Sequence, residues 1–174
     1  MVGSSIVVRW AKSTDIEFVD CIRCIINDSY AESEDGMWED GVDRISNADL
    51  CDIIKSGELF LAVKDNEIVG TGRTTIMNNS GCLGLLTCAK KCRGLGIGKL
   101  LLRFHEDNLL KNGFTISRVE LLYPIPISSF KQRVLSWYLR EGYVDNGHED
   151  FHPELKHKLV CKWEFKVFLK ELRI

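Results

Sequence analysis

The segment from Arg93 to Gly98 has the clearest chemical pattern in the chain. Its glycines, Gly94, Gly96 and Gly98, alternate with larger residues where an apolar, strand-like run gives way to an amphipathic helix. Glycine lets the backbone adopt unusual dihedral angles and approach a ligand closely, and the free N–H groups of a first helical turn carry the positive end of the helix dipole. The pattern therefore predicts a backbone cradle for an anionic group such as a diphosphate.

Two other glycine-rich phosphate loops do not fit this segment. A Walker A loop needs Ser or Thr after its Gly-Lys pair, whereas a leucine follows Gly98 and Lys99. A dinucleotide-binding fingerprint that began at Gly94 or Gly96 would need its third glycine at Lys99 or Leu101. The spacing R-x-x-G-x-G is itself common, because glycine makes up about 7% of residues and chance yields this spacing in roughly one chain in twenty. The elements around the cradle must therefore decide what it binds.

Composition narrows the class of protein. With 174 residues, 45% of them apolar, the chain can bury one core, and we expect one domain over residues 1–174. The net charge of -2 gives no overall field that would attract nucleic acid or an anionic membrane, so neither is expected as a partner. The chain has no signal-peptide pattern and no apolar run of about 18 residues, so we expect a cytoplasmic protein, with a nuclear location left open. Seven cysteines are an odd number, which favours reduced thiols over a disulfide framework.

Hydrophobic periodicity predicts the elements that must position the cradle. A capping box at Thr14 and Glu17 opens the first helix, and the helix that begins at Ile97 closes at Asn112 and Gly113. A meander of antiparallel strands precedes the cradle, and the strand that follows the cradle's helix should run parallel to its predecessor. The predicted strands are 5–10, 58–63, 67–76, 81–88, 116–123 and an alternating strand at 163–169, and the predicted helices are 14–30, 47–55, 97–112 and 128–140.

This order of elements, β-α-α-β-β-β-α-β-α-β-β with R-x-x-G-x-G between the fourth strand and the third helix, resembles the GNAT superfamily of acyl-CoA-dependent N-acyltransferases. The run Gly84-Leu85-Leu86-Thr87-Cys88, followed five residues later by Arg93, is similar to the superfamily's cofactor strand and loop. Residues 137–143, Trp-Tyr-Leu-Arg-Glu-Gly-Tyr, are similar to its aromatic-Tyr-x-x-x-Gly-aromatic segment. The resemblance implies an α/β fold of the mixed α+β kind, with a splayed central mixed sheet and flanking helices.

The resemblance also implies that acetyl-CoA binds as a co-substrate in the wedge between two splayed strands. Backbone groups of the cofactor strand would pair with the pantetheine arm, and the backbone N–H groups of the glycine loop would hold the pyrophosphate. The basic side chains of the loop would either attract the phosphates or remain solvated. The cofactor contacts implied in this way are Leu86, Thr87, Cys88, Arg93, Gly94, Leu95, Gly96, Ile97, Gly98, Lys99 and Tyr138.

Catalysis by such a protein has to move two protons. An alkyl ammonium has a pKa of about 10 and must lose a proton before it attacks, and the departing thiolate is helped by gaining one. By the resemblance, Tyr138 is the acid, one residue past a core-facing Trp137, with a packed structural tyrosine as the alternative. A backbone N–H near Cys88 would polarise the thioester carbonyl.

The base is less clearly indicated. Many relatives carry an acidic residue on the cofactor strand or its neighbour, and the cofactor strand here has none. Glu120 on the next strand is the first candidate, unless it serves only as a structural partner of Arg118 or Arg73. His148, His152 and a chain of water molecules are the other candidates.

The acceptor side departs from the commonest family pattern. Lys131 stands where relatives often have Asn, Val134 replaces a frequent Ala, and residues 124–126 form a Pro-Ile-Pro insert. Six carboxylates lie between residues 32 and 43, and an acidic wall with aromatic residues would suit a cationic amine, although a solvated loop explains the same pattern. The predicted substrate contacts are Tyr30, Trp38 and Glu39.

Two other patterns contain residue types that could form a metal site or a thiol nucleophile. His148 to His152 fits H-E-x-x-H, but Gly147 before it and Pro153 after it oppose the helix that a zinc site would need, so no metal is expected. Cys88 with His105 would make a thiol nucleophile only if both lay together, and His105 falls more than two turns into its helix.

The sequence thus predicts an acetyl-CoA-dependent N-acetyltransferase that acts on a primary amine by direct attack in a ternary complex, with a small or polyamine-like acceptor favoured. A protein amine as acceptor and a non-catalytic acyl-CoA-binding sensor are alternatives, and a metalloprotein is a third. The acceptor's identity, the acyl length and the oligomeric state, including a homodimer, stay open.

Overall fold

The computed structural model describes residues 5–173, and its centre is one mixed sheet of seven strands in the order β1-β2-β3-β4-β5-β7-β6. Every neighbouring pair is antiparallel except β4 and β5, which are parallel as predicted. The mixed α/β class predicted from the sequence is therefore confirmed. The strands are β1 (Ile6–Trp10), β2 (Leu59–Lys64), β3 (Glu67–Met77), β4 (Ser80–Cys88), β5 (Ile116–Pro124), β6 (Val144–His148) and β7 (Trp163–Glu171).

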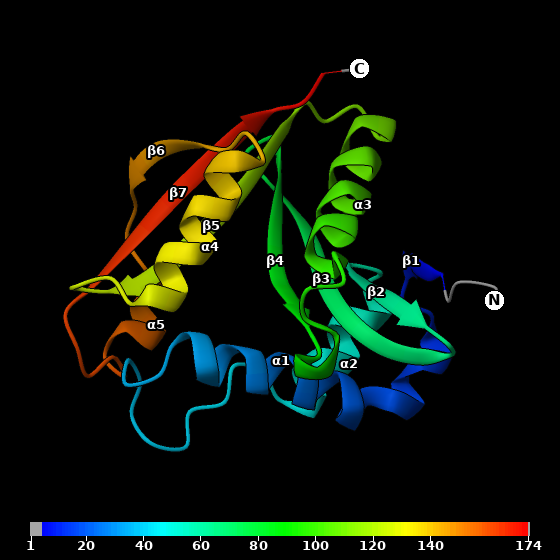
Figure 1. Cartoon of the computed structure of the whole chain (residues 1–174), viewed down its shortest axis with the longest axis horizontal. Helices are drawn as coiled ribbons and strands as arrows, with labels where there is room; N and C mark the ends of the chain where they lie inside the picture. The colour runs from blue at the N-terminus through cyan, green and yellow to red at the C-terminus, as the bar shows by residue number, and fades with distance from the viewer. Residues whose placement is uncertain (1–4, 174) are drawn as a thin grey trace.

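Helices cover both faces of this sheet. The principal ones are α1 (Val19–Ser33), α2 (Asn47–Lys55), α3 (Ile97–Lys111) and α4 (Ser129–Arg140); the short ones are η1 (Ser13–Phe18), η2 (Lys90–Cys92) and α5 (Pro153–Lys156). In Figure 1, α3 and α4 lie on either side of the gap between β4 and β5, and α1 runs past the open end of that gap.

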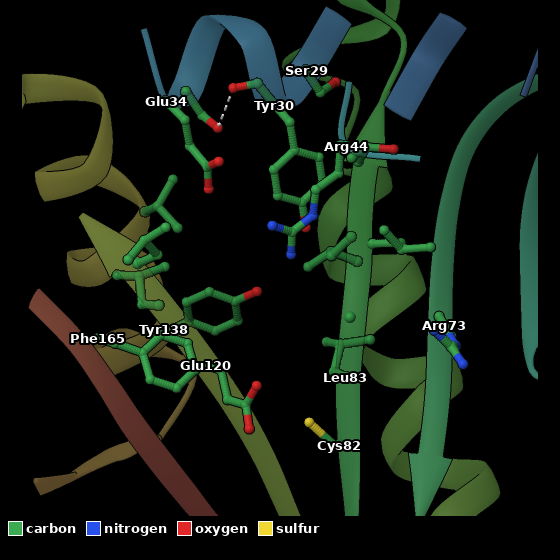
Figure 2. Close-up of a pocket in the computed structure, with 18 of the residues that line it drawn as sticks. Ser29, Tyr30, Glu34, Arg44, Arg73, Cys82, Leu83, Glu120, Tyr138 and Phe165 are labelled. Carbon is green, nitrogen blue, oxygen red and sulfur yellow. Dashed lines mark hydrogen bonds between the residues drawn. The ribbon is translucent and has the colours of Figure 1, made fainter. Parts of the chain in front are cut away.

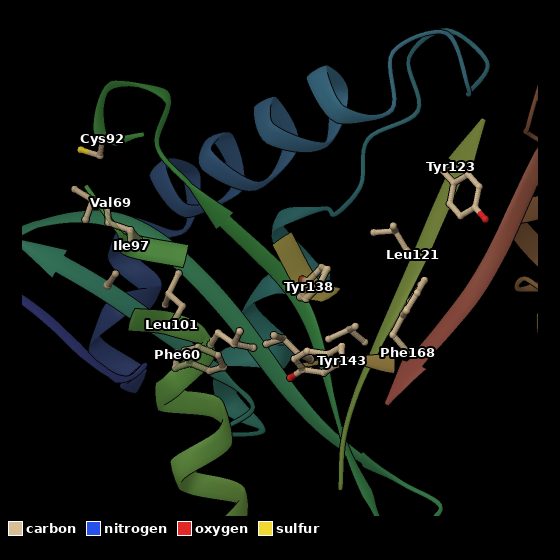
Figure 3. Packing of buried hydrophobic residues seen from close by; sticks show 14 residues of the cluster. Phe60, Val69, Cys92, Ile97, Leu101, Leu121, Tyr123, Tyr138, Tyr143 and Phe168 are labelled. Atoms are coloured by element: carbon tan, nitrogen blue, oxygen red, sulfur yellow. The ribbon is translucent and has the colours of Figure 1, made fainter. Parts of the chain in front are cut away.

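Strand β2 shows why both faces must be covered. Its residues alternate between two apolar clusters: Phe60 and Ala62 pack with residues of α3, whereas Leu59 and Leu61 pack with residues of α1 and α2. A strand that is apolar on both faces needs helices on both faces. Figure 3 shows that the first cluster extends across the sheet to Tyr123 of β5 and Phe168 of β7.

Three local features differ from the expectations drawn from the sequence. The first helix does not open with a capping box at Thr14, because buried Asp15 accepts a hydrogen bond from the backbone N–H of Lys12 at 2.6 Å and pairs with Arg9, which tightens the turn into 3-10 geometry. The short helix α5 between β6 and β7 was not predicted. Strand β7 also breaks its expected alternation, since Val167 and Phe168 are both buried.

The parallel pair β4–β5 is short, and this creates the wedge. The strands pair only from Gly81 to Leu83 and then diverge. Just beyond, Leu85 has a φ of 49°, a left-handed conformation unusual for leucine, and its carbonyl accepts a hydrogen bond from the Thr71 hydroxyl at 2.7 Å. This irregularity lies beside the register shift between β3 and β4, so it bends β4 away from β5.

Candidate active site

A cleft of about 920 Å³ fills the gap between the diverging strands β4 and β5. The end of α1 and the inner face of α4 complete its walls (Figure 2). Of the residues predicted to contact cofactor or substrate, or to catalyse, those that line it are Tyr30, Leu86, Thr87, Cys88, Arg93, Gly98, Glu120 and Tyr138.

The glycine loop leads directly into α3. Gly94 and Gly96 have φ values of 82° and 77°, which glycine adopts freely and other residues rarely do. The first helical hydrogen bond runs from the N–H of Leu100 to the carbonyl of Gly96, so the N–H groups of Ile97, Gly98 and Lys99 have no acceptor within the helix. The loop thus offers backbone donors at the positive end of a helix.

The side chains of the loop have other partners. Ile97 is buried in the core, Leu95 is exposed, and Lys99 pairs with Glu141 at 3.2 Å. Any contact of these residues with a phosphate would therefore go through their backbone. The Arg93 guanidinium makes two hydrogen bonds, of 2.8 and 2.9 Å, to Glu32 at the end of α1, so its side chain ties the loop to that helix.

The cofactor strand has an unpaired backbone edge toward the cleft. No pairing between β4 and β5 continues beyond Leu83, so Leu86 and Cys88 have no strand partner on that side. The carbonyl of Cys88 accepts a hydrogen bond from Ser29 of α1 at 3.3 Å, and the hydroxyl of Thr87 lies 2.8 Å from that of Thr71 on β3. An extended chain with amide groups could pair with the open edge as an added strand would.

Tyr138 presents a phenol that has no protein partner. The side chain is buried in the cleft wall, and none of the hydrogen bonds among the described residues uses its hydroxyl. By contrast, Tyr123 donates to Glu164 at 2.6 Å, and Tyr143 donates to Glu106 at 3.0 Å. Burial raises the pKa of Tyr138, so the phenol keeps its proton at neutral pH.

Glu120, on β5, belongs to a charged cluster in the wall of the cleft. Its Oε1 accepts hydrogen bonds of 2.8 and 2.7 Å from Arg118, whose guanidinium also pairs with Glu149. Arg73, the other proposed partner, pairs instead with Glu58 at 2.6 Å. Glu120 is therefore a structural partner of Arg118, the alternative to a catalytic role that the sequence left open. It also lines the cleft (Figure 2).

Of the predicted acidic wall, only Glu34 lines the cleft, and it is paired there with Lys131. Glu39 is exposed and lines neither the cleft nor a smaller cavity of about 190 Å³. Trp38 lines that smaller cavity, and its indole donates to Glu34 at 2.6 Å. Helix α1 extends to Ser33, and the carboxylates of residues 35–43 that follow it lie outside the cleft lining.

Two cleft residues were missed or undervalued by sequence reasoning. Lys131 is buried and pairs with Glu34 at 3.1 Å, and its departure from the family pattern was the only signal that it is unusual. Arg44 lines both cavities, although it follows helix α1 in a loop with no recognisable motif.

The two histidines of H-E-x-x-H lie in different elements. His148 ends β6 and lies 3.3 Å from Glu164, whereas His152 precedes α5 and lines both cavities. No group of three or more potential metal ligands occurs within residues 5–173. Over the same span, none of the helices has the length and apolar character that crossing a membrane requires. All seven cysteines are free thiols.

Comparison with known proteins adds a family match and a set of similar folds. A family model described as an acetyltransferase (GNAT) domain matches residues 55–145. The PaiA N-acetyltransferase of Thermoplasma acidophilum, in complex with coenzyme A, is similar over 96% of this chain and 99% of its own, with 18% identity and a TM-score of 0.68. No curated protein matches the chain by sequence.

Two further solved structures have the same fold. A GNAT-family acetyltransferase of Staphylococcus aureus Mu50 aligns with 97% of this chain and 100% of its own, with 19% identity and a TM-score of 0.67. The ribosomal-protein-S18-alanine N-acetyltransferase of Escherichia coli aligns with 98% and 96%, respectively, with 11% identity and a TM-score of 0.66. At these identities the structural likeness shows the fold, whereas the family model matches the sequence itself.

Proposed function

The chain belongs to the GNAT acetyltransferase family, and we propose that this enzyme transfers the acetyl group of acetyl-CoA to a primary amine by direct attack within a ternary complex. One observation carries the proposal: the wedge between β4 and β5 has the glycine loop at its entrance and the partnerless phenol of Tyr138 in its wall. A small amine is the favoured acceptor, and a protein amine is the alternative within the same chemistry.

The residues of the wedge fit an acyl-CoA. The backbone N–H groups from Gly94 to Lys99 would hold the pyrophosphate, since that loop is open and a Cβ at Gly94 or Gly96 would meet no atom within 4 Å. The open edge at Leu86 and Cys88 would pair with the amides of the pantetheine arm. This arrangement would place the thioester near the end of β4, beside Tyr138.

The transfer forms a bond between the amine nitrogen and the acetyl carbon and breaks the bond from that carbon to sulfur. The sulfur leaves as a thiolate, and the amine nitrogen gives up a proton. Tyr138 would donate a proton to the sulfur, because burial keeps its phenol protonated until negative charge develops nearby. A backbone N–H near Cys88 would stabilise the charge on the carbonyl oxygen.

The proton from the amine needs a base, and Glu120 is our first candidate. It lines the cleft from β5, on the side of the cleft where Figure 2 also shows Tyr138, and its Oε2 is left open because Arg118 binds Oε1. His152, which lines the same cleft, is the second candidate. His148 is a weaker one, since it lies outside the cleft lining and contacts Glu164.

The protonation of the two cleft cysteines favours direct attack by the amine over an acyl-cysteine intermediate. Burial raises the pKa of Cys82 to about 11 and also raises the pKa of Cys88. The thiolate is the nucleophilic form of cysteine, and at neutral pH both residues remain thiols.

The test combines acetyl-CoA binding with amine-dependent release of free thiol. We expect Tyr138→Phe to lower kcat by about 100-fold or more while the Kd for acetyl-CoA stays unchanged. Tyr123→Phe is the matched control, because that phenol donates to Glu164 and lies outside the cleft lining. Acetyl-CoA binding without turnover on any amine or peptide would favour the sensor, and turnover restricted to peptides would identify a protein acceptor.

A further inference from the structure

All but one of the Lys and Arg residues that line the cleft form ion pairs with carboxylates. Arg73 pairs with Glu58, Arg93 with Glu32, Arg118 with Glu120 and Glu149, and Lys131 with Glu34. Arg44 is the only other Lys or Arg that lines the cleft, and none of the ion pairs within residues 5–173 includes it. The cleft thus presents one cation without a carboxylate partner.

Arg44 is held where a ligand can reach it. Its guanidinium carbon lies 4.4 Å from the centre of the Tyr30 ring, a cation–π contact that fixes the side chain against α1. The guanidinium points into the cleft, between the Tyr30 ring and Tyr138 (Figure 2). Arg44 remains exposed to solvent and lines both the cleft and the smaller cavity, so it stands where the two join.

The carboxylates that share the cleft with Arg44 are paired with other residues or exposed. Glu120 and Glu149 pair with Arg118. Glu34, the nearest buried carboxylate, is already engaged by Lys131 and the Trp38 indole. Two other cleft carboxylates, Asp49 and Asp150, are exposed, and Asp49 accepts a hydrogen bond from the N-cap Ser46 of helix α2.

We propose that the acceptor amine also carries an anionic group, a carboxylate or a phosphate, that binds Arg44 while its amine faces Tyr138 and Glu120. A guanidinium offers a planar pair of donors that matches both groups, and stacking on Tyr30 leaves its edge free for them. The inference rests on the proposed function for the position of the amine. It replaces the polyamine-like acceptor, which depended on an acidic wall of which only Glu34, already paired with Lys131, lines the cleft.

The experiment compares amines that differ only at the end away from the reacting nitrogen. The short set is β-alanine, propylamine, trimethylenediamine and phosphoethanolamine, and the longer set is δ-aminovalerate, pentylamine and cadaverine. Binding to the CoA-saturated protein is measured by calorimetry, and turnover by thiol release. We expect the anionic member of at least one set to bind about tenfold or more tightly than its neutral counterpart, and the diamines to bind most weakly.

Variants then assign the preference to Arg44. Arg44→Gln should remove the advantage of the anionic amines, leave the neutral amines unchanged and leave the Kd for acetyl-CoA unchanged. Arg44→Lys should keep part of the advantage, because it retains the charge without the planar fork. Arg140→Gln is the control, since Arg140 is exposed on α4 and lines neither cavity.

The outcomes separate this inference from the proposed function. Tight binding of anionic amines without turnover would support the role of Arg44 and overturn the enzyme proposal. Turnover with no anionic preference, or a preference that survives Arg44→Gln, would overturn the role of Arg44 and leave the enzyme proposal standing. No binding of any anionic amine would also overturn it. Whichever of β-alanine and phosphoethanolamine binds more tightly shows whether the site prefers a carboxylate or a phosphate.

Discussion

Lys131 on α4 and Glu34 at the end of α1 form an ion pair of 3.1 Å in which both side chains are nearly inaccessible to solvent. Burial lowers the pKa of Lys131, while the Glu34 carboxylate opposes that shift. Glu34 also accepts a hydrogen bond from the Trp38 indole. The pair therefore joins two helices that line the cleft, at the family position where the sequence departs from Asn.

We expect Lys131→Met to lower the free energy of unfolding by about 3 kcal/mol, because it leaves the buried Glu34 carboxylate without its counter-charge. Lys91→Ala removes the exposed Lys91–Glu67 pair and should change the free energy of unfolding far less, because solvent screens that pair. Urea unfolding measures both. Adding Glu34→Gln to Lys131→Met should recover part of the loss, since the amide is neutral and still accepts from Trp38. A double variant less stable than Lys131→Met would contradict this account.

The sequence predicted well those features that are local. The order of strands and helices along the chain, the parallel step after α3 and the glycine turn that leads into that helix follow from hydrophobic period and glycine placement. The direction of side chains in the acceptor wall was not predictable. Whether Glu39 faces the cleft depends on where α1 ends, and the partner of Lys131 lies 97 residues away in the sequence.

Arg44 could not be identified as a site residue from the sequence. Its importance rests on a missing partner, and the pairing of every other cleft cation had to be known before that could be seen. Glu120 was found because a single acidic residue on a core strand is conspicuous. Whether the Glu120 carboxylate only binds Arg118 or also reaches the cleft depends on how far apart β4 and β5 lie. No short sequence pattern encodes that separation.

The glycine loop can be tested with a matched pair of variants. We expect Gly96→Val to raise the Kd for acetyl-CoA by about tenfold or more, because a branched side chain would fill the cradle and disturb its N–H donors. Gly41→Val is the control: Gly41 has nearly the same φ, 78° against 77°, and neither Cβ would meet another atom within 4 Å. Both variants should lose similar stability, but only Gly96→Val should lose affinity in calorimetry. Equal affinities would remove the loop from the donor site.

Glu120 and Glu149 bind the same guanidinium, so their amide variants separate catalysis from the positioning of Arg118. We expect Glu120→Gln to lower kcat/KM by about 100-fold, since the amide accepts from Arg118 but cannot take a proton from the amine. Glu149→Gln should have a much smaller effect. The pH dependence of kcat/KM identifies the base, because its acid limb should be lost only in Glu120→Gln. Equal losses in both variants would assign Glu120 a positioning role and move the base to His152.

His105 should make the fold sensitive to acid. The ring is fully buried, and its nitrogens lie 2.7 Å from the Thr74 hydroxyl and 3.0 Å from that of Ser117, which joins β3, α3 and β5. Burial lowers its pKa from 6.5 to about 4, so the unfolded chain takes up the proton first as the pH falls.

The stabilisation from neutral His105 is therefore complete above pH 6.5 and lost as the pH falls through about 4. We expect this residue alone to lower the free energy of unfolding by about 3 kcal/mol between those values. In urea unfolding at several pH values, His105→Gln should show a shallower slope, because glutamine can bond to Thr74 and Ser117 without titrating. His148→Gln, at an exposed position, should keep the wild-type slope. An unchanged slope in His105→Gln would mean that the acid sensitivity comes from the carboxylates, such as Asp15 and Glu149, whose pKa values are lowered by Arg9 and Arg118.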